Sequence, residues 1–266
     1  MFETKNPLEN LLADGGNCAI FRTIGVIGDS LSSGEHESRT DGKNGYHDYY
    51  EYSWGQFIAR ACGSTVYNFS AGGMAAHYFM NEYKQRDRLN ICAEGKKCQA
   101  YIVALGVNDI NCCNNKDDSL EFGSIDDAKI ENTELCPHTV AGYMGQIMRL
   151  IKSVEPKARI FLMTMPRDSE DEQNELRDKH RELMYQLAEM FEFTYVIDLR
   201  KYAPIYDDEF RRRYNLGYHM NAMGYLFTAK MVMTYIDAII NEKPEDFVQV
   251  GFIGRENDLH NENYKW

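Results

Sequence analysis

The stretch Thr23-Ile24-Gly25-Val26-Ile27-Gly28-Asp29-Ser30-Leu31 is an apolar run that ends abruptly in a polar turn. An apolar run without polar alternation is typical of a strand buried on both faces, and Gly, Asp and Ser are common turn formers. In an open parallel sheet, ligands bind outside the carboxyl ends of the strands. The stretch therefore predicts a buried strand that presents the hydroxyl of Ser30 to a crevice, although an ordinary polar turn would explain it equally well if it stood alone.

Two later segments, first a short β-branched and aromatic run and then an apolar run, end in residues suited to nucleophilic catalysis. Residues 65–69 break into glycines that include Gly73, and residues 100–105 lead to the amide of Asn108. One preorganised donor to an oxyanion contributes on the order of 2.7–4 kcal/mol to transition-state stabilisation. The pattern predicts an oxyanion hole formed by the Ser30 N–H, the Gly73 N–H and the Asn108 side chain.

A histidine suited to act as the base lies far downstream. His219 stands in the polar segment 214–225, after the last strand-like run and just before a long amphipathic segment. A nucleophile and its base meet in space and can occur in any order along the chain. Ser30 and His219 are therefore the candidate nucleophile and base.

Four segments resemble the sequence blocks of the GDSL or SGNH hydrolases. Gly28-Asp29-Ser30-Leu31 matches the first block, Asn68-Phe69-Ser70-Ala71-Gly72-Gly73 is similar to the second, and Gly106-Val107-Asn108-Asp109 matches the third. The segment around His219 is similar to the fourth. Each motif is short, but four in the family's order, from about residue 24 to about residue 230, make chance a poor explanation.

The resemblance implies both a fold and a reaction. The fold is a three-layer α/β/α sandwich with a flavodoxin-like, doubly wound sheet of five parallel strands. In the reaction Ser30 attacks a carboxylic ester, His219 transfers the proton to the leaving alcohol, and the acyl-enzyme is hydrolysed. The family's substrates are small esters with short acyl groups, including acetylated sugars, aryl esters and lysophospholipids, and no cofactor is implied. His36 and His47 are rival bases of lower rank, since neither lies in a family-like block.

One position departs from the family pattern. The family usually has an Asp three residues before the catalytic His, where this chain has Leu216. Removing that carboxylate from the protease subtilisin costs roughly 3 × 10⁴ in turnover. Three interpretations follow: a backbone carbonyl near Leu216 supports His219 in a Ser-His dyad, which we rank first; an upstream acid folds back to the histidine; or the protein is a catalytically impaired module that binds ligands. The candidate acids are Asp207, Asp208 and Glu209.

The rest of the chain alternates between strand and helix patterns. Its apolar, non-alternating strands predict a parallel sheet covered on both faces. Strands are expected over 158–165 and 193–199, and helices over 54–62, 139–154, 170–191 and 221–241. Residues 32–52 and 111–137 are expected to be long loops, and the first is expected to form a wall or lid beside the nucleophile.

Composition limits the classes of partner. The 266 residues are 44% hydrophobic, enough for one core, and we expect a domain over 23–241 with an extension, 1–22, and a tail, 242–266. The tail is apolar enough to pack on the domain or on a second subunit of a homo-oligomer. A net charge of −12 argues against nucleic acid. Without a long unbroken apolar stretch or a leader pattern at residues 1–7, we expect no membrane span and a cytoplasmic location.

Clusters of thiols and charges have plain interpretations. Seven cysteines without a secretion signal indicate free thiols, and their spacings do not match a zinc site, so no metal is expected. The acidic pairs 117–118 and 126–127 lack the spacing of a calcium loop and are expected on a solvated face. Residues 211–213, three consecutive arginines, are expected to be a solvated turn or helix end rather than an anion site.

Overall fold

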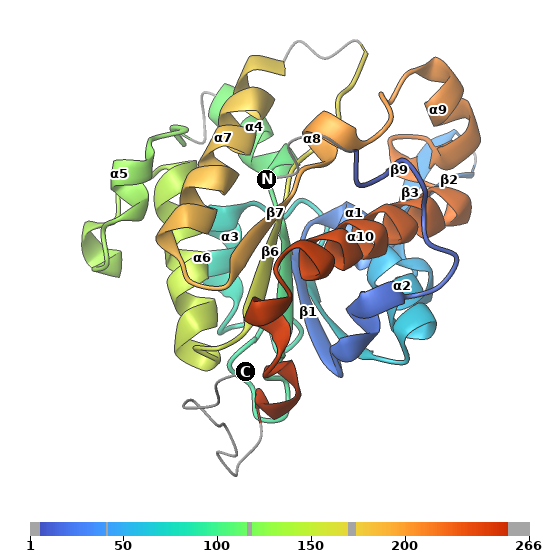
Figure 1. Ribbon diagram of the computed structural model, residues 1–266. Coiled ribbons are helices and arrows are strands. Elements are labelled where there is room, and N and C mark those ends of the chain that lie inside the picture. The colour runs from blue at the N-terminus through green and yellow to red at the C-terminus, as the bar shows by residue number, and fades with distance from the viewer. Residues whose placement is uncertain (1–5, 41, 116–118, 170–173, 255–266) are drawn as a thin grey trace.

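A five-stranded parallel sheet lies at the centre of the computed structural model, which describes residues 6–40, 42–115, 119–169 and 174–254 (Figure 1). The strands run in the order β4-β1-β5-β6-β7, and every neighbouring pair is parallel. This is the flavodoxin-like order, so the predicted sheet is confirmed. The bounds are β1 Thr23–Gly28, β4 Thr65–Ser70, β5 Ala100–Ala104, β6 Arg159–Met163 and β7 Thr194–Ile197.

Helices cover both faces of this sheet and complete the predicted three layers (Figure 1). One face carries α2 (Trp54–Cys62) and α10 (Ala222–Glu242), and the other carries α3 (Ala76–Glu82), α6 (Val140–Val154) and α7 (Asn174–Met190). The four helices expected from periodicity are present with closely similar bounds, except that residues 170–173 of the expected helix 170–191 lie outside the described residues. The remaining described α-helices are short: α1 Ser30–Ser33, α4 Val107–Asn114, α5 Ile125–Ala128, α8 Leu199–Tyr202 and α9 Asp208–Tyr214.

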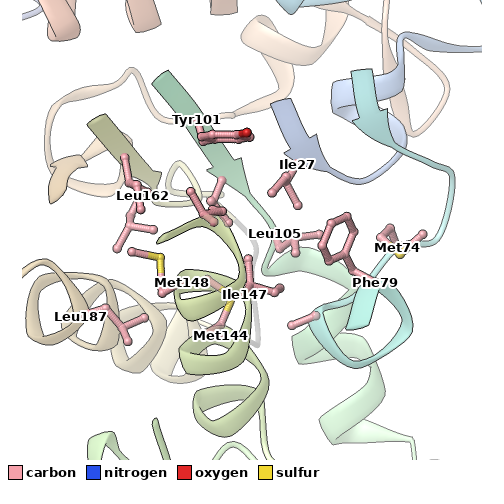
Figure 2. Close-up of a cluster of buried hydrophobic side chains, with 14 of the residues drawn as sticks. Ile27, Met74, Phe79, Tyr101, Leu105, Met144, Ile147, Met148, Leu162 and Leu187 are labelled. Carbon is pink, nitrogen blue, oxygen red and sulfur yellow. The ribbon is translucent and has the colours of Figure 1, made fainter. Parts of the chain in front are cut away.

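Successive residues of each strand supply the two cores. On β5, Tyr101 and Val103 face the layer of α3, α6 and α7, whereas Ile102 faces the layer of α2 and α10. Figure 2 shows the first core, where Ile147 of α6 lies against side chains from the sheet and from α3. Burying one large aliphatic side chain contributes about 1.5–3 kcal/mol. Two such cores explain why the strands read as unbroken apolar runs.

The segment that follows the nucleophile is ordered, so the expectation of a structureless loop over 32–52 was wrong. After α1, residues Glu35–Thr40 (β2) and Lys43–Asp48 (β3) form an antiparallel hairpin, and Tyr50–Tyr52 (η2) form a 3-10 turn. Gly42 adopts a φ of 74°, which a tight turn between the two strands requires. The hairpin does border the nucleophile, because β2 packs against β9 (His219–Met220) and β8 (Asn215–Leu216).

The second expected loop also contains helical turns. Between 111 and 137 lie the end of α4, the whole of α5 and the 3-10 turn η3 (Thr133–Leu135). Of the acidic pair 126–127, Asp127 completes the capping box of α5 and Asp126 pairs with Lys129. These carboxylates therefore have structural partners at the surface. The pair 117–118 lies outside the described residues.

The described parts of both terminal segments pack on the domain. Residues 6–22 include the 3-10 helix η1 (Gly16–Ile20), and the Leu12 N–H donates to Thr234 of α10 at 3.0 Å. The tail forms η4 (Pro244–Phe247) and η5 (Val250–Phe252), and it buries Phe247 and Ile253 in the core of α2 and α10. Through residue 254 the tail thus docks on its own chain.

Helix α10 is long and apolar enough to cross a membrane by length and composition, alone among the helices of the described ranges. Within the folded domain, however, 67% of its most apolar window is buried. Its buried residues include Tyr225, Val232 and Ile236, which pack against the sheet and α2. This degree of burial is typical of a core helix in a folded domain.

Candidate active site

Ser30 stands at the carboxyl end of the central strand. Strand β1 ends at Gly28, and Asp29 caps α1 by accepting a hydrogen bond from the Leu31 N–H at 3.0 Å. A side chain at position 28 would collide with Ser32, since a Cβ there would lie 2.2 Å from the Ser32 Oγ. Glycine therefore allows the sharp turn, and Ser30 becomes the first residue of a helix.

The predicted oxyanion donors follow the strands on either side of β1. Gly73 follows β4, has a φ of 70° and is exposed, and Asn108 is the second residue of α4, after β5. The Asn108 Nδ2 lies 3.2 Å from the Met74 carbonyl and 3.5 Å from Asp29 Oδ2. Because β4 and β5 are the two neighbours of β1, the structure brings all three predicted donors to one edge of the sheet.

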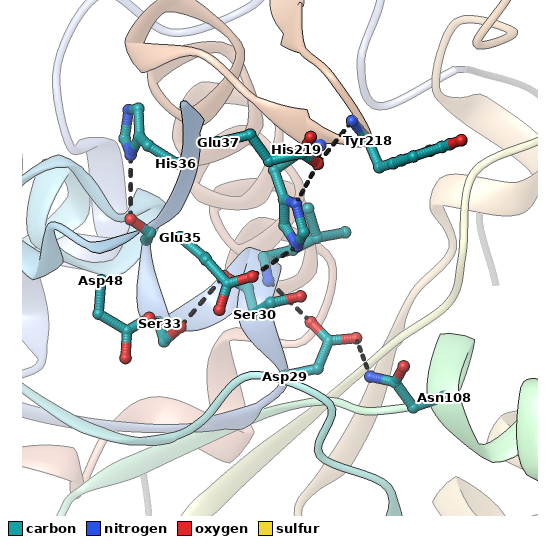
Figure 3. Close-up of polar contacts among 12 residues, drawn as sticks. Asp29, Ser30, Ser33, Glu35, His36, Glu37, Asp48, Asn108, Tyr218 and His219 are labelled. Carbon is teal, nitrogen blue, oxygen red and sulfur yellow. Dashed lines mark hydrogen bonds and ion pairs between the residues drawn. The ribbon is translucent and has the colours of Figure 1, made fainter. Parts of the chain in front are cut away.

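His219 reaches this edge from the short ribbon formed by β8 and β9. Helix α1, which carries Ser30, packs against β9, and Figure 3 shows the His219 ring beside Ser30. Each ring nitrogen contacts a carboxylate: Nδ1 lies 2.7 Å from Glu37 Oε1 and Nε2 lies 3.1 Å from Glu35 Oε1. The side chains of the three residues are only 14%, 9% and 15% exposed, in the order His219, Glu37 and Glu35.

Glu37 is held firmly in place. Besides His219 Nδ1, its Oε1 accepts hydrogen bonds from the backbone N–H groups of Tyr218 at 2.7 Å and His219 at 3.1 Å. Gly217 makes room for it: this residue has a φ of 72°, and a Cβ there would lie 2.0 Å from Glu37 Oε2. Hydrogen bonds therefore link the Glu37 carboxylate to the turn at Gly217 and to the His219 imidazole, 182 residues later in the sequence.

This contact differs from the expected support of His219. We expected a backbone carbonyl near Leu216, but Nδ1 contacts Glu37, and the Leu216 side chain is 47% exposed. The upstream acids make their contacts within α9: Asp207 accepts from the Phe210 N–H, Asp208 pairs with Arg211, and Glu209 pairs with Arg213.

Sequence reasoning missed Glu37 because it assigned residues 32–52 to a loop. The available signal was the spacing of Glu35 and Glu37, since alternate residues of a strand point to the same side. A strand assignment would have placed both carboxylates together.

Burial makes the site rich in carboxyl groups with raised pKa values. Burial raises the pKa of Asp29 to about 7 and that of Asp109 to about 6. Burial also raises the pKa of Glu35, with the nearby charges of Asp48 and Glu37 acting in the same direction and that of His219 opposing them. Asp109 has a structural partner, because the Ala76 N–H donates to it at 2.8 Å and ties α3 to α4.

A polar chain fixes the hairpin to the sheet edge. Ser33 donates to Asp48 at 2.6 Å, and Asp48 pairs with Arg88 at 3.0 Å. The Arg88 Nε in turn donates to the Ser70 carbonyl at 2.8 Å, at the end of β4. The end of β3 is therefore anchored beside the segment that carries Gly73.

The remaining sequence candidates have other contacts. His36 Nδ1 contacts the Gly34 carbonyl at 3.0 Å, and His47 Nε2 contacts Ser38 at 2.8 Å. The seven cysteines are free thiols, as expected. Within the described ranges, no group of three or more His, Cys, Asp and Glu side chains could hold a metal ion. The arginines at 211–213 form the last turn of α9, the expected helix end.

Solved structures share this fold. A protein of Chitinophaga pinensis described as a possible lipase is 15% identical, with a TM-score of 0.54 over 84% of this chain and 98% of the other. A family 3 carbohydrate esterase of Clostridium thermocellum is 13% identical, with a TM-score of 0.52 over 83% of this chain and 97% of the other. The acetyl xylan esterase AlAXEase is 13% identical, with a TM-score of 0.52 over 80% of this chain and 99% of the other.

Sequence comparison identifies the family. A comparison with curated proteins found no match. The model of the GDSL-like lipase/acylhydrolase family matches residues 26–226, which span β1 to the first turns of α10 and include Ser30, Asn108 and His219. The match covers most of the chain and all four motif segments. The chain therefore belongs to the GDSL-like lipase/acylhydrolase family and is an ester hydrolase.

Proposed function

We propose that this protein is a serine esterase in which Ser30 is the nucleophile, His219 the base and Glu37 the acid that orients the histidine. The observation that carries the proposal is the 2.7 Å contact between Glu37 Oε1 and His219 Nδ1. A carboxylate at Nδ1 fixes the tautomer that leaves Nε2 available to the serine and stabilises the imidazolium that forms. Glu37 thereby performs the work that the family assigns to the position of Leu216.

The reaction follows from this arrangement. The Ser30 Oγ attacks the ester carbonyl carbon while His219 Nε2 takes the hydroxyl proton. The backbone N–H groups of Ser30 and Gly73 and the amide of Asn108 stabilise the oxyanion. The intermediate collapses when Nε2 returns the proton to the alcohol oxygen and the C–O bond breaks. Water, deprotonated by the same nitrogen, then attacks the acyl carbon; the bond to Ser30 Oγ breaks, Nε2 returns the proton to Oγ, and the acid is released.

We further propose an acetylated carbohydrate as the substrate. Three observations favour this class: two similar structures are carbohydrate esterases, Tyr46 packs its ring edge-on to His219 at 5.8 Å, and Tyr218 is 85% exposed. Exposed tyrosines beside a reaction centre offer apolar faces and hydroxyl groups to a sugar ring. The alternative of an impaired module that binds ligands rested on Leu216, and Glu37 removes its main support.

Labelling with an organophosphonate serine probe tests the catalytic assignment. We expect intact-mass and peptide analysis to find the label on Ser30, with much slower labelling in the Asn108→Ala variant. Folded protein that takes no label, or Ser30→Ala that still hydrolyses p-nitrophenyl acetate, would contradict it. Release of acetate from an acetylated xylo-oligosaccharide, measured against a simple aryl acetate, tests the substrate class.

A further inference from the structure

Glu35 lies at the nitrogen on which the proposed reaction depends. Its Oε1 is 3.1 Å from His219 Nε2, the atom that must receive the Ser30 proton and pass it to the leaving alcohol. Figure 3 shows the Glu35 carboxylate beside both Ser30 and the His219 ring. Glu35 and Glu37 are alternate residues of β2, so their side chains leave the strand on the same side. One strand thus supplies a carboxylate to each nitrogen of the base.

The two carboxylates are anchored very differently. Glu37 accepts two backbone N–H bonds in addition to its imidazole contact. Among the described residues, the Glu35 carboxylate forms its hydrogen-bond or ion-pair contact with His219. Its backbone is fixed, because the Tyr225 hydroxyl donates to the Glu35 carbonyl at 2.5 Å. The strand that carries Glu35 is therefore rigid, but the carboxylate can leave His219 Nε2 by rotation of the Glu35 side chain.

The position of Glu35 coincides with that of the leaving group. A general acid must lie within about 2.6–3.2 Å of the oxygen that it protonates. The oxygen that Glu35 places 3.1 Å from Nε2 thus stands where the alcohol oxygen of a bound ester must stand. Its other oxygen reaches toward the oxyanion side, since a Cβ on Gly72 would lie 2.6 Å from Oε2. A bound ester must displace this carboxylate and then lies beside it.

The charges and burial around Glu35 determine which leaving groups can lie beside its carboxylate. Burial and the charges of Asp48 and Glu37 raise its pKa, while His219 lowers it. Once displaced from Nε2, the carboxylate loses its imidazole partner in a site that is only 15% exposed. A buried carboxylate without a donor is costly, and a hydrogen bond from the substrate would offset that cost. An anionic leaving group would instead meet several carboxylates of the same sign.

We propose that Glu35 selects the leaving alcohol: displaced from Nε2 by the ester oxygen, its carboxylate accepts a hydrogen bond from a hydroxyl on the adjacent carbon of that alcohol. The inference rests on the proposed function and adds to it that the alcohol carries a hydroxyl group on the carbon next to the esterified one. Glu35 is then a specificity-determining residue, and esters of alcohols without a second hydroxyl are poorer substrates.

A pair of matched esters tests this assignment. Ethyl acetate and 2-hydroxyethyl acetate differ by one hydroxyl group, and a pH-stat measures the hydrolysis of both. We expect wild-type kcat/KM to favour the hydroxyl ester by about tenfold or more, the size of a hydrogen bond to a charged group. Glu35→Ala is expected to lose this preference, so that its kcat/KM values for the two esters become nearly equal.

Controls separate the possible failures. Glu51→Ala removes an exposed glutamate just beyond the hairpin and is expected to keep the preference. Glu35→Gln retains the shape and an acceptor oxygen without the charge and is expected to show an intermediate preference, which covers the case in which Glu35→Ala folds poorly. An unchanged preference in both Glu35 variants, or an equal fall on both esters, would overturn the proposal. Activity of Ser30→Ala on either ester would instead overturn the proposed function.

Discussion

Replacement of Glu37 by glutamine is the most informative perturbation of this site. Glutamine has nearly the same shape, and its amide oxygen can still accept the N–H groups of Tyr218 and His219 that hold Glu37 at 2.7 and 3.1 Å. The variant therefore keeps the turn and removes the negative charge beside Nδ1. Its effect on turnover measures what that charge contributes to the imidazolium formed during the reaction.

The size of the effect follows from the contact. With Nδ1 and Oε1 2.7 Å apart, the centres of the two charged groups lie about 4 Å apart, where opposite unit charges attract by about 4 kcal/mol at an effective dielectric constant of about 20. Each 1.36 kcal/mol changes a rate about tenfold, so the attraction corresponds to a factor of roughly 10³ in turnover. Loss of the carboxylate from subtilisin's triad, roughly 3 × 10⁴, sets an upper limit. Glu35, the second carboxylate beside His219, remains in Glu37→Gln and reduces the fall in turnover.

The assay is steady-state hydrolysis of p-nitrophenyl acetate by wild type, Glu37→Gln and Asp207→Asn. The last variant is a matched control: it makes the same carboxylate-to-amide change at a candidate acid that caps α9, and Asn caps a helix as well as Asp. We expect turnover to fall by a factor of roughly 10² to 10⁴ in Glu37→Gln and to change little in Asp207→Asn. A loss smaller than about threefold in folded Glu37→Gln would refute the assignment of Glu37.

Four further variants test other parts of the structure. Asn108→Ala should lower turnover by a factor of about 10²–10³ with little change in KM, because it removes one oxyanion donor; an unchanged turnover would exclude that role. Gly217→Ala should lose activity as severely as Glu37→Gln, since its φ is 72° and its Cβ would lie 2.0 Å from Glu37 Oε2; wild-type turnover would show that the contact can relax. Burial raises the pKa of Asp29 to about 7, so ionisation of this acid destabilises the fold progressively as pH rises from about 4 to about 7. Urea unfolding should show Asp29→Asn gaining stability relative to wild type between pH 5 and pH 8, by at most about 3 kcal/mol, and a difference independent of pH would contradict this. Phe247→Ala should lower the free energy of unfolding by about 3–5 kcal/mol without changing turnover, because Phe247 is 6% exposed and stacks on Tyr195; an unaltered melting temperature would mean that the tail adds no stability.

The central sheet was predictable because its strands are buried on both faces. Four of the five strands are mostly apolar, β4 is a shorter run of β-branched and aromatic residues, and Ser30, Gly73 and Asn108 each follow one of these strands. The order β4-β1-β5 then brings these residues together, since the carboxyl ends of neighbouring parallel strands share an edge. Local sequence patterns were therefore enough to predict most of the fold and the positions of the candidate oxyanion donors.

The hairpin and its carboxylates were not predictable in the same way. Residues 35–40 are nearly all polar, so no apolar alternation marks β2 as a strand. The dipeptide Asp41-Gly42, a favoured hairpin turn, was the remaining signal in the sequence. The contact of Glu37 with His219 spans 182 residues and depends on the turn at Gly217, which no local pattern reveals. We therefore looked for the supporting acid near His219, where this chain has Leu216.

The distance along the chain between Glu37 and His219 has a consequence for protein synthesis. Ser30 and both glutamates are synthesised before the base, which follows 182 residues after Glu37. At about 5–20 residues per second, that interval is roughly 9–36 s. During it the nascent chain holds its hydroxyl and its acids without a partner that could activate them. Reactivity at Ser30 would then report that the segment containing His219 has been translated and has docked against the hairpin.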